Sequence, residues 1–511
     1  MSGRGPERRS VGGAAGALAA GGGGEQPSPR PAAVPITLYL SVALAFTFLA
    51  ALPAPGLVNL LDGASLALLT MLAATPIWYA TARARHSPFD QVASRAIAII
   101  LASAGFLIFW SLLSTFGVAA PARASRYIAT LIAAFSIYFL VRGTVTRGRV
   151  SLYVDVLAAG LAATSALSLL GYEIDGLRDI IFRGTDRAAG LFKNPNQFGM
   201  AISTTVPAVM ALLVAERQRR WFRVACLILM LLGLVASGSK TNFLLAWGTI
   251  LAVLCGNAWI SHTGAQRYGM LALSVLGSLV FAGVGIVALS FINPRALGIM
   301  MAFFGGDGEV DSLLTRSFLW VYSVDQFLAD PILGQGAGQS IDIFYRAEDV
   351  SHSHNVLLDY MRTLGAPGLL GVALMIGTVV VVCLLTLSRA LRSGSGPPAA
   401  RLLCFGLSLN CLSYVAANMS SDSFGPSTSP FFWLFAYLTF AARNLMRPLP
   451  STVIPRRRKP AKRADLNRFP ALVPQAAFET EHEHIEEHRQ PGYVLWLILA
   501  AILFLVAIAA L

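Results

Sequence analysis

The sequence predicts an all-α, polytopic integral membrane protein, and three observations support this fold class. The chain has 511 residues, of which 55% are hydrophobic and only 13% are charged. A soluble domain carries about 25% charged residues. The mean hydropathy is +0.64, and the apolar residues gather in stretches near the roughly 20 residues that one helical crossing needs. Because the bilayer offers the backbone no water, each stretch should be a helix.

About twelve such stretches are expected in the body of the chain, with an extra one at the C-terminal end. The body stretches are 36–52, 64–80, 96–113, 127–141, 152–170, 198–215, 224–236, 243–259, 270–291, 368–387, 402–417 and 431–442. The extra stretch, 493–511, follows a polar tail. The connections between body stretches are mostly short, and the longest, 293–354, is expected to be a large loop.

Basic residues predict the orientation, since short loops rich in Lys and Arg stay in the cytoplasm. With the N-terminus inside, one set of arginines falls entirely on the cytoplasmic side: Arg83, Arg85, Arg95, Arg142, Arg147, Arg149, Arg217, Arg219, Arg220, Arg223, Arg389, Arg392 and Arg401. The large loop 293–354 and the polar loop 171–196 then face outward. A loop as long as 293–354 is usually functional rather than a spacer.

Four regions follow from this pattern. Residues 1–34 are rich in Gly, Ala and Pro and are expected to be a disordered cytoplasmic extension. Residues 35–445 form the transmembrane domain, 446–491 a basic and then acidic cytoplasmic tail, and 492–511 the extra helix. The His- and Glu-rich run in the tail fits a solvated charged segment better than a metal site.

The net charge of +13 does not indicate nucleic acid. The excess lies in loops beside the membrane and in the tail, where orientation and anionic lipid headgroups explain it. Membrane lipids are therefore the expected partners, and no nucleic acid is expected. The five cysteines lie in or beside apolar stretches without paired spacing. We expect them to be small core residues.

The first candidate for chemistry is His354, which is followed by Asn355 where the large loop returns to the membrane. The chain has only seven histidines, and an imidazole can take a proton from a hydroxyl near neutral pH. His352 lies two residues away and could share a metal with His354 in an extended segment. No convincing third ligand accompanies the two histidines, so no metal site is expected.

Two further segments carry outward-facing cations. Arg187 precedes Asn196, which can cap the next membrane helix, so this segment is either an anion-binding edge or a capped loop with surface salt bridges. Lys240 follows a turn of small residues and either holds a phosphate or extends to the interface. The large loop holds Arg316 and the glycine-rich run 334–338, which reverses the chain or approaches a substrate and does not match a nucleotide-binding pattern.

In order, these segments resemble the O-antigen ligase family of membrane glycosyltransferases, which also includes Wzy-type polysaccharide polymerases. The matching pieces are Arg187 with Gly-Leu-Phe-Lys-Asn-Pro-Asn at 190–196, Ser-Gly-Ser-Lys at 237–240, Arg316 with Trp320, Asp-Pro-Ile-Leu-Gly-Gln-Gly at 330–336, and His354-Asn355 followed by Leu358. The resemblance extends over roughly 36–442. The family more often has arginine where Lys240 stands, and a lysine keeps the charge but loses the planar fork.

The resemblance implies transfer of a glycan from an undecaprenyl-diphosphate carrier to an acceptor sugar hydroxyl, on the periplasmic face of the bacterial inner membrane. It assigns His354 as the base, and Arg187, Lys240 and Arg316 as contacts of the diphosphate, with Asn196 and Asn355 in support. No cofactor is expected, because the donor already carries an activated bond. The acceptor is lipid A-core for a ligase or a growing polysaccharide for a polymerase. A transporter or flippase of a lipid-linked sugar is the alternative from another class.

Overall fold

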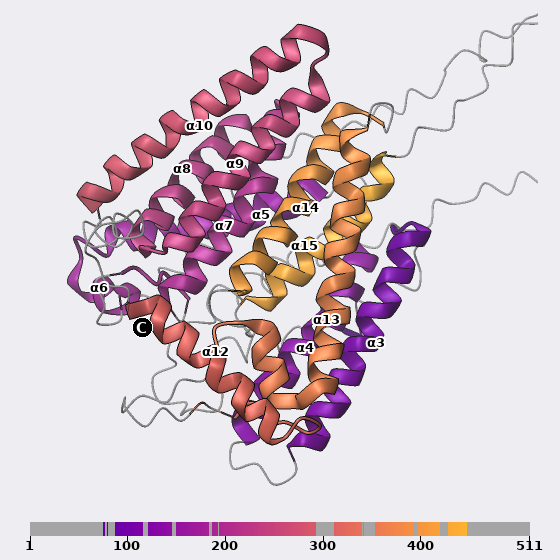
Figure 1. Ribbon diagram of the computed structural model, residues 1–511. Helices are drawn as coiled ribbons and strands as arrows, with labels where there is room; N and C mark the ends of the chain where they lie inside the picture. The colour runs from indigo at the N-terminus through magenta and orange to yellow at the C-terminus, as the bar shows by residue number, and fades with distance from the viewer. Residues whose placement is uncertain are drawn as a thin grey trace, which may run out of the picture.

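The computed structural model describes residues 75–76, 79, 87–115, 121–145, 150–182, 187–192, 194–292, 311–339, 341, 353–392, 396–419 and 428–446. Within these ranges the chain is an all-helical bundle (Figure 1). Eight helices of the described part are long and apolar enough to cross a membrane. They are α3 (Gln91–Ser114), α5 (Val150–Leu170), α7 (Pro195–Ala215), α8 (Arg220–Ser237), α9 (Lys240–Ser261), α10 (Gly264–Ile292), α13 (Val356–Leu391) and α14 (Pro398–Asn418). The prediction of a polytopic membrane protein is confirmed.

Two more helices coincide with predicted spans. α4 (Pro121–Thr144) contains the expected stretch 127–141, and α15 (Ser429–Ala442) contains 431–442 and continues into the 3-10 turn η2 (Arg443–Met446). Each predicted stretch from 96–113 to 431–442 thus meets a helix. The stretch 36–52, nearly all of 64–80, the extra helix 493–511 and the terminal regions 1–34 and 447–511 lie outside the described residues, so the count of twelve stays a prediction.

The expectation for the large loop needs correction in two places. Residues 311–329 form helix α12 (Asp311–Ala329), with Leu319 and Ser323 on its buried side. The helix expected at 368–387 begins at Val356, because Asn355 caps it. α13 is broken at Gly365, whose φ of 69° and ψ of −161° are not helical. A second short helix, α6 (Asp175–Phe182), lies in the loop 171–196.

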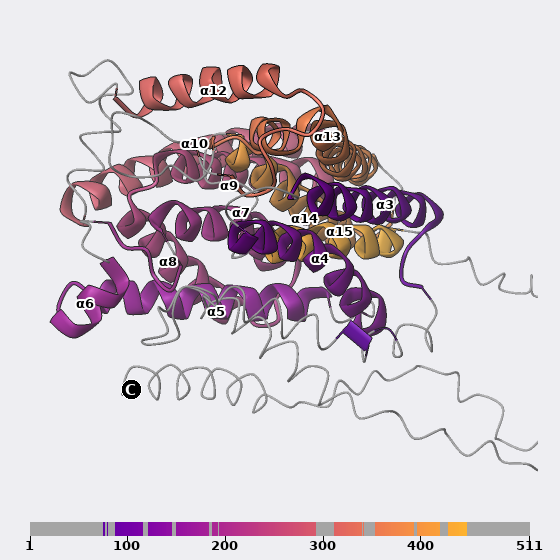
Figure 2. The ribbon, with the colours of Figure 1, turned by 90° about the horizontal axis from the view of Figure 1, so that it is seen from below.

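Successive membrane helices run in opposite directions, so the bundle has two distinct ends. α4, α7, α9, α13 and α15 begin at the end where α3, α5, α8, α10 and α14 finish. The short helices α6 and α12 lie at this end (Figure 1), which we call the α6–α12 end. Viewed as in Figure 2, α12 lies at the edge of the bundle, and it packs against α13.

The centre of the bundle is the contact between α7 and α14. Gly406 of α14 lets the two helices approach closely, since a Cβ there would lie 2.5 Å from Ala211 Cβ and 2.7 Å from Pro207 O. Pro207 interrupts the backbone hydrogen bonding of α7, because proline has no N–H. The next residue, Ala208, donates its N–H to Asn410 Oδ1 of α14 at 2.9 Å. α7 is the most buried of the eight spans.

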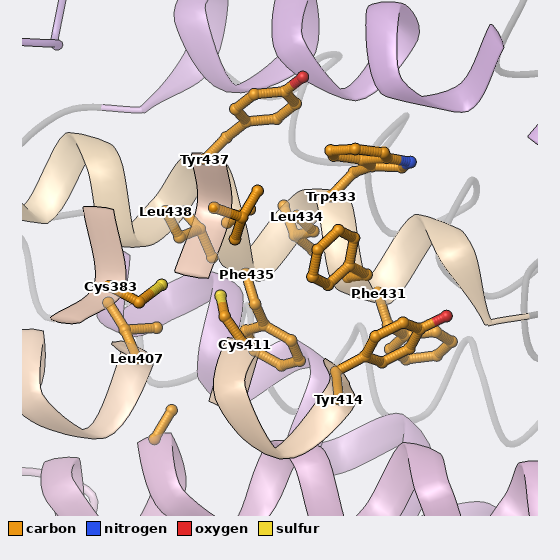
Figure 3. Close-up of a cluster of buried hydrophobic side chains, with 14 of the residues drawn as sticks. Cys383, Leu407, Cys411, Tyr414, Phe431, Trp433, Leu434, Phe435, Tyr437 and Leu438 are labelled. Atoms are coloured by element: carbon orange, nitrogen blue, oxygen red, sulfur yellow. The ribbon is translucent and has the colours of Figure 1, made fainter. Parts of the chain in front are cut away.

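An aromatic cluster packs α15 against this centre. Figure 3 shows Phe431, Trp433 and Tyr437 of α15 together with Tyr414 of α14. Tyr414 and Phe432 stack with ring centroids 4.9 Å apart. All five cysteines are free, four of them buried and Cys255 partly buried, which agrees with their predicted place in the core.

At the opposite end of the bundle, buried ion pairs connect neighbouring helices. Arg223 of α8 pairs with Asp155 of α5 at 2.7 Å, and Arg443 after α15 pairs with Asp90, the N-cap of α3, at 3.2 Å. The described members of the predicted cytoplasmic arginine set also lie toward this end. The bundle therefore concentrates those arginines on one side, as the sequence predicts.

Candidate functional site

The start of α7 forms the first part of the candidate site. Asn194 is the N-cap, and its side chain accepts a hydrogen bond from Gln197 N at 2.9 Å. The prediction that Asn196 caps this helix is wrong, because Pro195 occupies the first helical position and Asn196 follows it inside the helix. The Asn196 side chain instead accepts a hydrogen bond from Arg187 Nη2 at 2.7 Å.

Arg187 joins the start of α7 to the end of α8. Its Nε donates to the carbonyl of Ser237 at 2.8 Å, and its Nη2 donates to Asn196. One residue later, Ala188 N donates to Ala236 O at 3.0 Å. Two directional bonds fix the guanidinium plane, so Arg187 is held in one orientation.

Lys240 is the first residue of α9 and follows the α8–α9 turn. The turn depends on Gly238, whose φ of 57° is left-handed. Asn242 ties this turn to α7, since its Nδ2 donates to Asn196 O at 3.1 Å and to Ser239 Oγ at 2.8 Å. The backbone of Lys240 is thus placed beside the segment that carries Arg187. We call Arg187, Asn196, Ser237, Lys240 and Asn242 the Arg187–Lys240 cluster.

Gly199 of α7 makes this close packing possible. A Cβ at Gly199 would lie 2.9 Å from Ser239 Cβ, 3.0 Å from Ser237 Oγ and 3.3 Å from Asn242 Nδ2. A larger residue would push the α8–α9 turn away from α7. The close approach of α7 to the α8–α9 turn therefore depends on Gly199.

The second part of the site is the turn Ser353–His354–Asn355, which we call the His354 turn. His354 has a left-handed φ of 55°, a conformation that costs a non-glycine residue about 1–2 kcal/mol. The side chain of Asn355 caps α13 by accepting from Leu357 N at 3.0 Å and Leu358 N at 3.2 Å. His354 is half-buried, and its Nδ1 atom is buried.

Helix α12 supports the His354 turn from outside the bundle. Trp320 Nε1 donates to the carbonyl of Ser353 at 3.0 Å. Arg316 lies four residues before Trp320 on the same helix and is half-buried. Since residues four apart share one helix face, Arg316 is on the part of α12 that approaches the turn. Trp320 therefore contacts the residue before His354, and Arg316 lies one helical turn away from Trp320.

The end of α14 connects the two parts of the site. Asn355 Nδ2 donates to Met419 O at 3.3 Å, and the preceding Asn418 lies 3.3 Å through its Nδ2 from Met200 Sδ. Met200 is one turn beyond Asn196 on α7. The His354 turn and the Arg187–Lys240 cluster are thus linked indirectly at the α6–α12 end.

The glycine-rich run 334–338 forms backbone hydrogen bonds with α13. Gln335 N donates to Arg362 O at 2.9 Å, and Gly336 N donates to Thr363 O at 3.0 Å. Gly334 and Gly365 both have positive φ, and a Cβ on Gly334 would lie 2.6 Å from Gly365 N. These amides bind α13 at its break, so the run serves chain reversal rather than a phosphate cradle.

No group of three His, Cys, Asp or Glu residues suited to a metal ion occurs among the described residues. His352 lies outside the described part. The basic and amide side chains of the α6–α12 end suit an anionic ligand.

Several polar residues of the site were not singled out by sequence reasoning. Asn242 and Asn418 link α9 and α14 to the start of α7, while Asp359 and Arg362 form a buried pair on α13. A signal for the two asparagines was present, because amide side chains inside apolar helices mark packing or functional contacts.

Comparison with known protein families gives a match to part of the chain. Residues 225–373 match the family model described as O-antigen ligase. The matched segment contains Lys240, Arg316 and the His354 turn, whereas Arg187 and Asn196 precede it. Comparison with curated proteins gives no match. Residues 225–373 are therefore similar to the O-antigen ligase family, which is the family that the motifs resemble.

Proposed function

We propose that this protein transfers a glycan from an undecaprenyl-diphosphate carrier to an acceptor sugar hydroxyl, in the manner of an O-antigen ligase. The observation that carries the proposal is the placement of the Arg187–Lys240 cluster and the His354 turn at one end of the bundle, linked through Asn355, Met419, Asn418 and Met200. A scaffold without catalysis would give no reason for this gathering of cations, amides and an imidazole.

The reaction needs both parts of the site. The acceptor hydroxyl oxygen bonds to the anomeric carbon of the donor sugar while the bond from that carbon to the diphosphate oxygen breaks. The hydroxyl proton passes to His354 as general base, and the electron pair of the broken bond leaves with the carrier diphosphate. Arg187, Lys240 and Arg316 stabilise the charge that develops on this leaving group.

Helix geometry supports binding of the diphosphate. α7, α9 and α13 begin at the α6–α12 end, and helix N-termini carry partial positive charge and amide donors. Arg187 is held by two bonds, which reduces the conformational entropy lost on binding. Asn196 and Asn355 are supporting residues, since one holds Arg187 and the other caps α13.

The arginines at the opposite end favour a cytoplasmic location for that end. The α6–α12 end then faces the periplasm across the bacterial inner membrane. The donor would reach it from the outer leaflet, and the acceptor would be lipid A-core. A polymerase would use the same donor chemistry with a growing polysaccharide as acceptor, so the two differ only in the second substrate.

A transporter or flippase is the alternative from another class. Carriers place charged groups near the membrane midplane, often in broken helices, whereas the candidate residues here lie in the helix starts and connections at one end of the bundle. Purified protein in proteoliposomes, supplied with a lipid-linked glycan and an acceptor, tests the proposal. Transfer should yield a new glycosidic bond and free undecaprenyl diphosphate. Movement of intact donor between leaflets without either product would contradict it.

The acceptor can be identified in cells. A deletion strain of a ligase should accumulate free lipid core with intact carrier-linked polymer. A deletion strain of a polymerase should instead carry single repeat units on its surface. The second pattern would contradict the ligase assignment while leaving the donor chemistry in place.

A further inference from the structure

We infer that Asp359 and Arg362 of α13 are positioning residues for His354, an inference that rests on the proposed function of this turn. They fix the backbone that directs the imidazole, although neither is placed against the substrate. The two side chains form an ion pair at 3.2 Å, with Arg362 fully buried and Asp359 nearly so.

Three hydrogen bonds fix Ser353. Its N–H donates to Asp359 Oδ1 at 3.3 Å, its carbonyl accepts from Trp320 Nε1 at 3.0 Å, and its hydroxyl donates to Asn355 O at 2.9 Å. His354 lies between this buried residue and the cap of α13. Its left-handed φ cannot relax to the ordinary region without breaking bonds on one side or the other.

Asp359 is itself fixed by Arg362. Arg362 Nη2 donates to Asp359 Oδ1 at 3.2 Å and to Gln339 O at 2.8 Å. Its Nη1 donates to Gln326 Oε1 at 3.4 Å. The arginine therefore connects the carboxylate that holds Ser353 to the end of α12 and the loop after it. Asp359, Arg362 and Trp320 together hold Ser353 from α13 and α12.

The ion pair between Asp90 and Arg443 at the opposite end is a control, because its loss should affect the stability of the fold but not the position of His354. Asp90 accepts from Ala93 N at 2.8 Å and from Arg443 Nε at 3.2 Å. Like Asp359, it is a nearly buried aspartate that holds one backbone N–H and one buried arginine. Removing either carboxylate deprives a buried arginine of its counter-charge and should destabilise the fold. Only Asp359 is bonded to the His354 turn.

The experiment compares Asp359→Ala with Asp90→Ala in purified full-length protein. Both variants should lower Tm, whereas only Asp359→Ala should lower kcat, by about 10²-fold, as expected for a misplacement near 1 Å. Donor Kd should be unchanged. The inference is overturned if Asp359→Ala keeps the wild-type kcat per folded molecule, or if Asp90→Ala loses kcat to the same extent.

A second pair of variants removes the effect of the unpaired charge. Asp359→Ala/Arg362→Met and Asp359→Asn/Arg362→Met both lack the ion pair, but only the second keeps an oxygen that can accept from Ser353 N. Asp359→Ala/Arg362→Met should have the same low kcat as Asp359→Ala. Asp359→Asn/Arg362→Met should recover most of the wild-type kcat. Equal kcat in the two double variants contradicts the positioning role. If His354→Ala itself retains the wild-type rate, the proposed role of His354 as the base is wrong; if only the Asp359 variants do, the inference alone is wrong.

Discussion

Each end of the bundle contains a residue in the left-handed backbone conformation that is not glycine. Among the described residues these are Arg219 at the opposite end, with φ 57°, and His354 at the α6–α12 end, with φ 55°. Arg219 lies in the short α7–α8 turn, and its side chain is 36% exposed and pairs with Asp155 at 3.2 Å. His354 instead lies between a fully buried serine and the cap of α13.

The two residues bear the same backbone strain for different reasons. At Arg219 a short connection between antiparallel helices requires the conformation, and a glycine would serve the turn equally well. At His354 a glycine would also fit, but it would remove the imidazole. Strain that is kept at a residue with a reactive side chain, and held by its neighbours, is characteristic of functional sites. Under the proposed function, the α6–α12 end therefore holds the reactive side chains in place, whereas the ion pairs of the opposite end hold helices together.

The largest effect on donor binding should come from removing a cation at the α6–α12 end. Arg187→Ala should weaken donor binding about 10- to 100-fold, because hydrogen bonds to charged groups contribute about 1.5–3 kcal/mol. Lys240→Ala should have a smaller effect, since an ammonium lacks the fork. Arg219→Ala is the control at the opposite end and should leave donor affinity unchanged. Calorimetric titration with a soluble prenyl-diphosphate glycan measures all three, and equal weakening by Arg219→Ala would remove the distinction between the ends.

A second test adds one methyl group at Gly199, which packs against the α8–α9 turn. Gly199→Ala should lower the free energy of unfolding by about 1–3 kcal/mol and weaken donor binding, because the methyl displaces the α8–α9 turn. Gly248→Ala on α9 is the control, since its Cβ would meet nothing within 4 Å. It should leave binding unchanged and stabilise the helix by up to about 1 kcal/mol. Thermal unfolding in detergent distinguishes the variants, and identical behaviour of the two would show that the close approach at Gly199 is unimportant.

The smallest effect on stability should come from replacing the two strained residues by glycine. His354→Gly should raise the free energy of unfolding by about 1 kcal/mol through relief of strain while abolishing transfer. In Arg219→Gly the same relief is offset by loss of a partly exposed ion pair, which contributes about 0.2–1 kcal/mol, and transfer should continue. A strongly destabilised His354→Gly would mean that the imidazole is kept for packing.

Among the described residues the sequence was sufficient to predict the membrane helices and their order, because apolar stretches of bilayer length are a strong signal. It also placed Arg187, Lys240 and His354 at one end through alternation of direction. α12 was not predicted, since its sequence is more polar than that of a membrane span. Its exposed side still carries Phe318, Val321 and Leu328.

The pair of Asp359 and Arg362 was missed for a related reason. Their spacing of three residues suits an ion pair on a helix, but the predicted span began at 368 and left them in a loop. The cap of α7 was misplaced by two residues, because both Asn194 and Asn196 flank Pro195 and both can cap a helix. A local signal that favours Asn194 was present, since proline is common at the first position of a helix.

The central claim is that the α6–α12 end binds the carrier diphosphate with one group of residues and activates the acceptor hydroxyl with another. It is tested most directly by measuring donor Kd and the single-turnover rate of glycan transfer for wild type and His354→Gln. We predict a donor Kd within about twofold of wild type and a transfer rate lower by about 10²–10⁴-fold, the contribution of a general base. Transfer by His354→Gln at the wild-type rate would contradict the claim.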